Sequence, residues 1–201
     1  MLAEREGLAG DVSAETLIIK AAIAVMAEHG YHGTSVRDIA ERADLSPASL
    51  YNHFASKQGI LVAIMERGID ELLRRTRAAL DDAPADPAAR LRAIVAVHVL
   101  YHLEDQGGTL LGTSELRALE ESARTTHVAK RRCQERIFAD VVTEGVRRGA
   151  FTTPYPEEAA RAIVTMCTAV AAWYRPDGAL TRPEITARYQ TLALATAGAS
   201  A

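Results

Sequence analysis

The chain has 201 residues, of which 48% are hydrophobic and 24% charged, and its formal net charge is −3. These values are typical of a soluble globular protein, and they exclude a disordered chain, a collagen-like repeat and a disulfide scaffold. No stretch approaches the ~20 consecutive apolar residues of a membrane span. The polar N-terminal sequence MLAEREGLAGDVSAE lacks the apolar core of a signal peptide. We therefore expect a cytoplasmic protein with no membrane partner.

The charges are distributed unevenly along the chain. Residues 1–59 carry five Lys or Arg and eight Asp or Glu side chains, a net charge of −3, whereas residues 60–201 carry eighteen of each. Neither part has the basic excess that is typical of non-specific nucleic-acid binders. A DNA-binding function must therefore depend on local residues.

Motifs of metal binding and catalysis are missing from the sequence. Cys133 and Cys167 lie far apart in helical-looking sequence and fit small buried apolar residues. No Cys/His cluster has zinc-finger spacing, so we expect neither a metal nor a cofactor. The chain also lacks GxSxG, HExxH and a Gly-rich phosphate loop, which argues against an enzyme.

Capping residues and apolar periodicity predict helices along the whole chain from residue 13 onward. The expected helices are 13–29, 35–43, 47–54, 57–80, 87–106, 110–119, 122–148, 156–174 and 183–197. Ser, Asp and Pro residues stand at their starts, and Gly30, the pair Gly107-Gly108 and Gly149 are expected to end helices. No strand-like alternation persists. The predicted fold class is all-α, with about nine helices and a linker at 81–87.

The segment from Ser35 to Phe54 carries the most specific functional signal. Two short helices joined by a tight turn form a helix-turn-helix, whose second helix enters the DNA major groove. The second helix offers small or neutral polar residues on the face away from Leu50, namely Pro47, Ala48, Ser49, Tyr51, Asn52 and His53. Ser35 and Lys57 each begin a helix, where backbone N–H groups can meet a phosphate. From spacing alone, DNA binding and the mere packing of three amphipathic helices remain open.

The run GYHGTSVRDIAERADLSPASLYNHFASKQGIL (30–61) resembles the N-terminal domain of TetR-family transcriptional regulators. The resemblance lies in the Gly-x-x-x-Thr-Ser-Val-x-x-Ile-Ala entry, the Ala-x-Leu-Ser turn and the Leu-Tyr-x-His-Phe-x-Ser-Lys exit. It implies that 13–59 form a DNA-binding domain and 60–201 an effector-binding and dimerisation domain. By position, the resemblance implies phosphate contacts for Tyr51, His53 and Lys57. The residues that would face bases or the sugar–phosphate edge are Pro47, Ala48, Ser49 and Asn52. The core of the small domain would contain Val36, Ile39, Leu45, Leu50 and Phe54.

The helix 87–106 is apolar nearly all round, which indicates burial. His98 and His102 lie four residues apart on one face, either as two metal ligands or as a hydrogen-bonded pair that lines a cavity or core. Tyr101, on an adjacent face, is a candidate ligand contact.

A basic stretch follows in the helix 122–148, with Lys130, Arg131, Arg132 and Arg136. It fits a solvated helix face or an anion-binding mouth. The segments 110–124 and 171–181 are similar to those of TetR regulators that respond to acyl-CoA thioesters. The expected effector-binding residues are Val97, His98, Leu100, Tyr101, Arg124, Met166 and Val170. An acyl-CoA thioester is the first expectation for the effector, with a cationic or neutral hydrophobic compound as the alternative.

The helices 156–174 and 183–197 are rich in alanine and other small residues. The resemblance implies that they form a four-helix homodimer interface, so that the dimer reads a palindromic double-stranded DNA operator. The sequence thus predicts a ligand-responsive transcriptional regulator, most simply a repressor. The alternative is a helical ligand carrier or interaction protein that has lost DNA binding.

Overall fold

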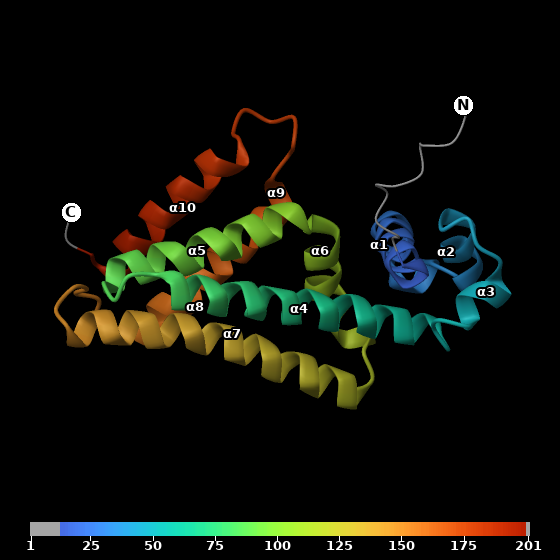
Figure 1. Ribbon diagram of the computed structural model, residues 1–201, viewed down its shortest axis with the longest axis horizontal. Helices are drawn as coiled ribbons and strands as arrows, with labels where there is room; N and C mark the ends of the chain where they lie inside the picture. The colour runs from blue at the N-terminus through green and yellow to red at the C-terminus, as the bar shows by residue number, and fades with distance from the viewer. Residues whose placement is uncertain (1–12, 200–201) are drawn as a thin grey trace, which may run out of the picture. The chain divides into compact units, whose positions relative to one another are not determined.

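The computed structural model describes residues 13–199. Residues 1–12, and with them most of the segment considered as a signal peptide, lie outside the described residues. The helices in chain order are α1 (Ala14–Gly33), α2 (Val36–Arg42), α3 (Pro47–Tyr51), α4 (Lys57–Asp82), α5 (Pro87–Glu104), α6 (Gln106–Ser114), the 3₁₀-helix η1 (Leu116–Ala118), α7 (Glu121–Arg147), α8 (Pro156–Thr168), α9 (Val170–Trp173) and α10 (Arg182–Ala197) (Figure 1). Apart from one isolated β-bridge, the regular structure within 13–199 is helical, which confirms the all-α prediction.

The chain divides into two compact units, one ending at Ile64 and the other beginning at Met65, both positions inside α4. In the N-terminal unit α2 packs on both α1 and α3. Its core includes Ile18, Ala22, Ile39 and Leu50, each with no exposed surface. The apolar positions read from the sequence therefore do face inward, because amphipathic helices this short are stable only when they pack.

Local signals set the helix starts in this unit. The Ser13 hydroxyl caps α1 and the Ser46 hydroxyl caps α3, each by accepting a backbone N–H three residues later. Gly30 adopts φ +72° and interrupts α1, as its lack of a β-carbon permits. The chain then makes a further turn to Gly33 before α2 begins.

In the C-terminal unit α5 is the central helix. It packs against α7, α8, α9 and α10, and α10 runs beside it over most of its length (Figure 1). One large core joins these helices and contains fully buried Leu91, Ile94, Phe138, Ile163 and Val170. A smaller cluster joins Tyr101 of α5 to Ile69, Leu72 and Leu73 of α4. The near-uniform apolarity of α5 thus reflects its burial from several sides.

The predicted end of the α5 helix at Gly107-Gly108 is wrong. The helix stops at Glu104, because Asp105 leaves helical geometry at φ −113° and ψ 58°. Its carboxylate then accepts the N–H of Gly108 at 3.2 Å and caps α6, which contains both glycines. The expected helix 110–119 is accordingly α6 followed by η1.

Two further boundaries differ from prediction. The expected helix 156–174 is divided at Ala169 into α8 and α9. The third helix of the N-terminal unit ends at Tyr51 and not at Phe54. Within the described residues, no helix is both long and apolar enough to cross a membrane.

Candidate functional site

The outer face of α3 carries the polar residues expected to read DNA. Leu50 is fully buried and Tyr51 beside it is 53% exposed, so α3 is anchored by one residue and offers the next to solvent. The exposed members of the predicted set are Ser35, Pro47, Ala48, Tyr51, Asn52 and His53, and Ser49 is half-buried. The fold of the N-terminal unit therefore brings these residues to its surface.

The start of α2 is a complete capping box. The amide N–H of Ser35 donates to the Asp38 carboxylate at 2.7 Å, and the Asp38 N–H donates to the Ser35 hydroxyl at 3.2 Å. The hydrogen bonds from Ser35 lower the pKa of Asp38. A phosphate that approaches this helix end must therefore use the N–H groups that the box leaves open.

Lys57 makes contacts that the sequence did not predict. Its ammonium donates to the carbonyl oxygens of Tyr31 and Thr34, both at 2.7 Å, and lies 4.3 Å from the centre of the Tyr31 ring. These bonds tie the start of α4 to the turn between α1 and α2. Lys57 thus has a positioning role within the N-terminal unit, and its phosphate contact stays a prediction.

Arg37 is an exposed cation of the N-terminal unit that the predicted DNA-binding set does not include. It is exposed on α2, and it makes no hydrogen bond or ion pair with the residues in 13–199. In the other arginine of α2, Arg42, Nη2 donates to both carboxylate oxygens of Glu28, at 2.8 and 3.0 Å. The two arginines differ because Glu28 of α1 lies beside Arg42. The sequence alone does not show this proximity.

Inside the C-terminal unit, five helices are joined by a chain of buried and partly buried hydrogen bonds. The Gln134 amide Nε2 contacts the Thr76 hydroxyl at 2.9 Å and His98 Nδ1 at 3.2 Å. His98 Nε2 lies 2.9 Å from the Thr168 hydroxyl and 3.1 Å from His102 Nε2. His102 Nδ1 lies 2.8 Å from the Thr109 hydroxyl. We call this set (Thr76, His98, His102, Thr109, Gln134 and Thr168) the polar relay.

With the Gln134 amide in this orientation, the hydrogen bonds of the polar relay assign one proton to each imidazole. Because the Gln134 amide donates, His98 Nδ1 must accept, and the His98 proton sits on Nε2. His102 Nε2 then accepts, and its Nδ1–H donates to Thr109. Both rings are neutral, since burial holds the pKa of His98 well below its usual value. Burial, and secondarily the charge of Arg131, lowers the pKa of His102 to about 4.

The predicted effector contacts are placed on more than one side of α5. Tyr101 is buried against α4, and its hydroxyl donates to Asp105 at 3.2 Å. Val170 and half-buried Met166 belong to the large core on the α8 side. His98 is buried in the polar relay, whereas Val97, Leu100 and Arg124 are half-buried. The sequence identified the central helix, but it did not show which residues share a wall.

The basic stretch of α7 divides into engaged and open cations. Lys130 forms ion pairs with Glu66 and Asp70 of α4, the second at 2.8 Å. His127 Nδ1, which is buried, lies 4.0 Å from the Glu66 carboxylate. Arg131 and Arg132 are exposed and form no ion pair with described residues. Lys130 therefore joins two helices, while its neighbours stay open to an anion.

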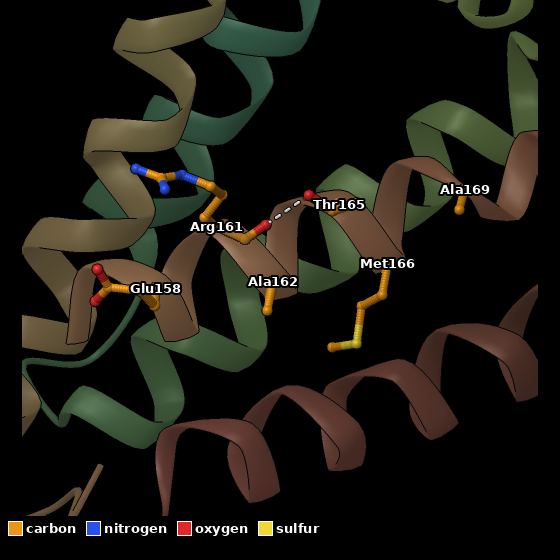
Figure 2. Close-up of a pocket in the computed structure, with 6 residues that line it drawn as sticks. All are labelled: Glu158, Arg161, Ala162, Thr165, Met166 and Ala169. Atoms are coloured by element: carbon orange, nitrogen blue, oxygen red, sulfur yellow. Dashed lines mark hydrogen bonds between the residues drawn. The ribbon is translucent and has the colours of Figure 1, made fainter. Parts of the chain in front are cut away.

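An open groove of about 500 Å³ follows one face of α8. Figure 2 shows its lining, in which Ala162, Met166 and Ala169 supply the apolar part and Glu158, Arg161 and Thr165 the polar part. Large apolar side chains are also exposed on the next two helices, with Trp173 of α9 46% exposed and Leu192 of α10 49% exposed. Trp173 stacks on Tyr189 of α10 at 6.3 Å between ring centres. Apolar side chains are thus exposed on α8, α9 and α10.

Comparison with known proteins agrees with both units. Residues 18–64 match the family of bacterial regulatory proteins of the tetR type, and residues 84–197 match the tetracyclin repressor-like C-terminal domain. The chain is 29% identical over 181 residues to the HTH-type transcriptional repressor KstR2 of Mycobacterium tuberculosis, with 88% of this chain and 89% of that protein covered. It is 25% identical over 164 residues to the fatty acid metabolism regulator protein of Bacillus subtilis, with coverage of 80% and 83%.

The fold agrees as well. A solved bacterial regulatory protein of the tetR family from Rhodococcus RHA1 superposes with a TM-score of 0.87 at 30% identity, over 94% of this chain and 99% of that one. Two matched family regions, an exposed α3 and a helical C-terminal unit lead to one assignment. The chain belongs to the TetR family of bacterial transcriptional regulators.

Proposed function

We propose that this protein is a ligand-responsive repressor that binds a palindromic operator as a homodimer and dissociates when an acyl-CoA thioester binds. The exposed polar face of α3, anchored through buried Leu50, is the observation that carries the DNA-binding part. A relative of nearly equal length is named a transcriptional repressor, and a second is named a fatty acid metabolism regulator. The first name favours repression of genes, and the second favours an effector from fatty acid metabolism.

The DNA contacts follow from side-chain chemistry. Tyr51 and His53 contact phosphates, and Ser49 and Asn52 read base edges together with the small residues Pro47 and Ala48. Exposed Arg37 adds a charge-assisted phosphate contact that Lys57, with two carbonyl partners, is less able to supply. These assignments give α3 both positioning and reading contacts.

The homodimer is supported by the apolar surface of α8, α9 and α10. Ala162, Ala169 and Leu192 are exposed there, and small side chains allow helices to approach closely. Other residues of the same helices, among them Ile163 and Ala193, are fully buried in the chain's own core. The interface therefore uses only the outer face of each helix, and a two-fold dimer matches a palindrome.

The effector part of the proposal rests on the presence of both apolar side chains and cations in the C-terminal unit. Half-buried Val97, Leu100 and Met166, with Val170 of the adjoining core, suit an acyl chain, and exposed Arg131 and half-buried Arg124 suit the anionic end of the molecule. Effector binding favours a spacing of the two DNA-reading heads that no longer matches successive major grooves, ~34 Å apart. Release requires this difference in affinity between the two states.

The test is titration of a preformed complex. The protein is bound to the promoter DNA beside its own gene in a fluorescence-anisotropy assay, and long-chain acyl-CoAs, free fatty acids and cationic dyes are added separately. We expect release by acyl-CoAs alone. Release by dyes alone, or by none of these compounds, would contradict the effector assignment.

A second function, a carrier that has lost DNA binding, is favoured by one observation. The N-terminal unit is acidic overall, and two of its cations, Arg42 and Lys57, are engaged within the protein. Tyr51→Ala separates the two functions. In a repressor it weakens binding broadly, by about tenfold or more, across operator variants, because phosphate contacts do not specify sequence. In a carrier, wild type and variant bind promoter DNA equally poorly.

A further inference from the structure

Gln134 of α7 has a buried oxygen with no partner. The side chain is 2% exposed, and its Oε1 accepts no hydrogen bond from any residue in 13–199. An unsatisfied polar atom in a protein interior costs about 1–3 kcal/mol. Such an atom is informative, because native interiors satisfy nearly all of their polar groups.

The polar relay holds the Gln134 amide in this orientation. The Thr76 hydroxyl donates to the Leu72 carbonyl at 2.8 Å, so it accepts from Gln134 Nε2 and has no proton left for an oxygen. Turning the amide over would place its oxygen against the Thr76 hydroxyl, whose proton is engaged by the Leu72 carbonyl, and would require the other tautomer of His98. In the orientation that the structure shows, Gln134 Oε1 is an acceptor for which the described residues supply no donor.

A second open group lies on the same face of α7. Positions 131, 134 and 138 are spaced three and four residues apart, so that they form one stripe along the helix. Along it, Arg131 is exposed, Gln134 is buried and Phe138 is fully buried. The stripe thus runs from a cation with no ion pair among residues 13–199, through a hydrogen-bond acceptor, to an apolar ring. This order matches an amphipathic anion that enters with its apolar end first.

The charge of Arg131 reaches the interior. It contributes to the lowered pKa of both His102 on α5 and His127 on α7. Lys130 also lowers the pKa of His127 but is paired with two carboxylates, and Arg132 contributes to neither histidine. Arg131 is thus the cation of these three that acts on both histidines.

We propose that Arg131 and Gln134 form a specificity subsite for the effector, in which Arg131 pairs with an anionic group and Gln134 Oε1 accepts a hydrogen bond from a ligand donor. This inference rests on the proposed acyl-CoA effector and names the residues that select it. A pantetheine amide N–H is a suitable donor in every acyl-CoA, and a hydroxyacyl-CoA adds a second donor, the hydroxyl on its acyl chain. Either one satisfies the buried oxygen.

Calorimetric titration with dodecanoyl-CoA and 3-hydroxydodecanoyl-CoA tests the Gln134 contact. Gln134→Met keeps the side-chain length and removes the acceptor, whereas Thr76→Val breaks the same relay and leaves Oε1 in place. We expect Gln134→Met to lose about tenfold more affinity than Thr76→Val. A loss confined to the hydroxylated thioester identifies the acyl hydroxyl as the donor, and an equal loss for both identifies the pantetheine amide.

The Arg131 contact is tested by the same calorimetric titration of Arg131→Gln and of its neighbour Arg132→Gln. Circular dichroism first checks that both variants are folded. We expect the first to lose about tenfold or more in affinity for both thioesters and the second to bind like wild type. Equal behaviour of these two variants, or no loss in Gln134→Met beyond Thr76→Val, overturns the subsite alone. Failure of wild type to bind either thioester overturns the proposed effector and the subsite with it.

Discussion

At the scale of single residues, Lys57 and Tyr51 show how two positions of one motif differ in role. Both belong to the Leu-Tyr-x-His-Phe-x-Ser-Lys run, and the family resemblance gives both a phosphate contact. In the structure Tyr51 is exposed, whereas the ammonium of Lys57 is held by two carbonyl oxygens. A sequence motif records that a residue is required, but it does not separate contact with DNA from support of the fold.

Lys57→Met therefore tests for a structural role. The substitution keeps most of the aliphatic stem and leaves the Tyr31 and Thr34 carbonyls without their charged donor. We expect the free energy of unfolding to fall by about 1–3 kcal/mol, in addition to any loss of operator affinity. Urea titration followed by circular dichroism measures this. Tyr51→Ala is the matched control, and an equal stability of all three proteins would show that the Lys57 bonds contribute nothing.

His102 supplies a pH dependence with a defined sign. Its pKa is about 4 in the folded protein against 6.5 in its ordinary state, so the unfolded chain binds the proton more readily between these values. The free energy of unfolding therefore falls as pH drops from about 6.5 to 4, by up to about 3 kcal/mol from this residue. Thermal unfolding over that range, compared between wild type and His102→Gln, isolates the contribution from that of the carboxylates. A wild type that is no more acid-sensitive than the variant contradicts the assignment.

At the scale of helices, capping chemistry explains where sequence reasoning succeeded. Ser35, Ser46 and Asp86 each cap the helix expected of them, because a short polar side chain can satisfy an N-terminal N–H without tertiary contacts. The error at Gly107-Gly108 arose where two signals competed. The Asp105 cap acts two residues before the glycines, and glycine inside a helix is tolerated at a cost of about 1 kcal/mol.

The polar relay was the part of the candidate site that could not be predicted. Its members come from five helices, and only His98, His102 and Thr109 are close in sequence. Thr76, Thr168 and Gln134 lie in segments whose pattern predicts nothing more than a helix. Their contacts depend on the packing of α4, α7 and α8 around α5, and that packing follows from the whole core.

Gly145 and Gly112 are two helical glycines at which the same substitution by alanine should have opposite effects on stability. A β-carbon on Gly145 of α7 would overlap the Phe151 ring, which fills the space beside the helix. One on Gly112 of α6 would meet no atom within 4 Å. We expect Gly145→Ala to lower the free energy of unfolding by about 1–3 kcal/mol through overpacking. Gly112→Ala should raise it by up to about 1 kcal/mol, since alanine favours helices.

Differential scanning calorimetry of the two glycine variants provides the measurement. Opposite shifts of the unfolding temperature are expected, because the substitutions are the same and only the neighbouring space differs. A destabilised Gly112→Ala, or an unchanged Gly145→Ala, would contradict the packing described for α6 and α7.

At the scale of the whole molecule, the outer face of α8, α9 and α10 is the surface for which a partner is expected. The family resemblance implied dimerisation through these helices, whose small residues allow close approach, and the structure leaves only part of each helix exposed. Ala159, Ile163 and Ala193 are buried within the chain, and Ala169 and Leu192 remain at the surface. The division is physical, because one side of a helix must complete the core before the other is available to a second copy.

Leu192→Arg is expected to produce a monomer. Leu192 is 49% exposed, and burial against a second copy would remove its apolar surface from water at a gain of about 25 cal/mol per Å². An arginine there places an unpaired charge in an apolar interface, which costs several kcal/mol.

Leu110→Arg is the control, because Leu110 is 45% exposed on α6, outside the proposed interface, and its replacement should leave the dimer intact. Light scattering with size-exclusion chromatography distinguishes the two states. A monomeric wild type, or a dimeric Leu192→Arg protein, contradicts the interface. Since a single helix-turn-helix rarely binds tightly alone, the monomeric variant should also lose operator affinity while its α3 face stays unchanged.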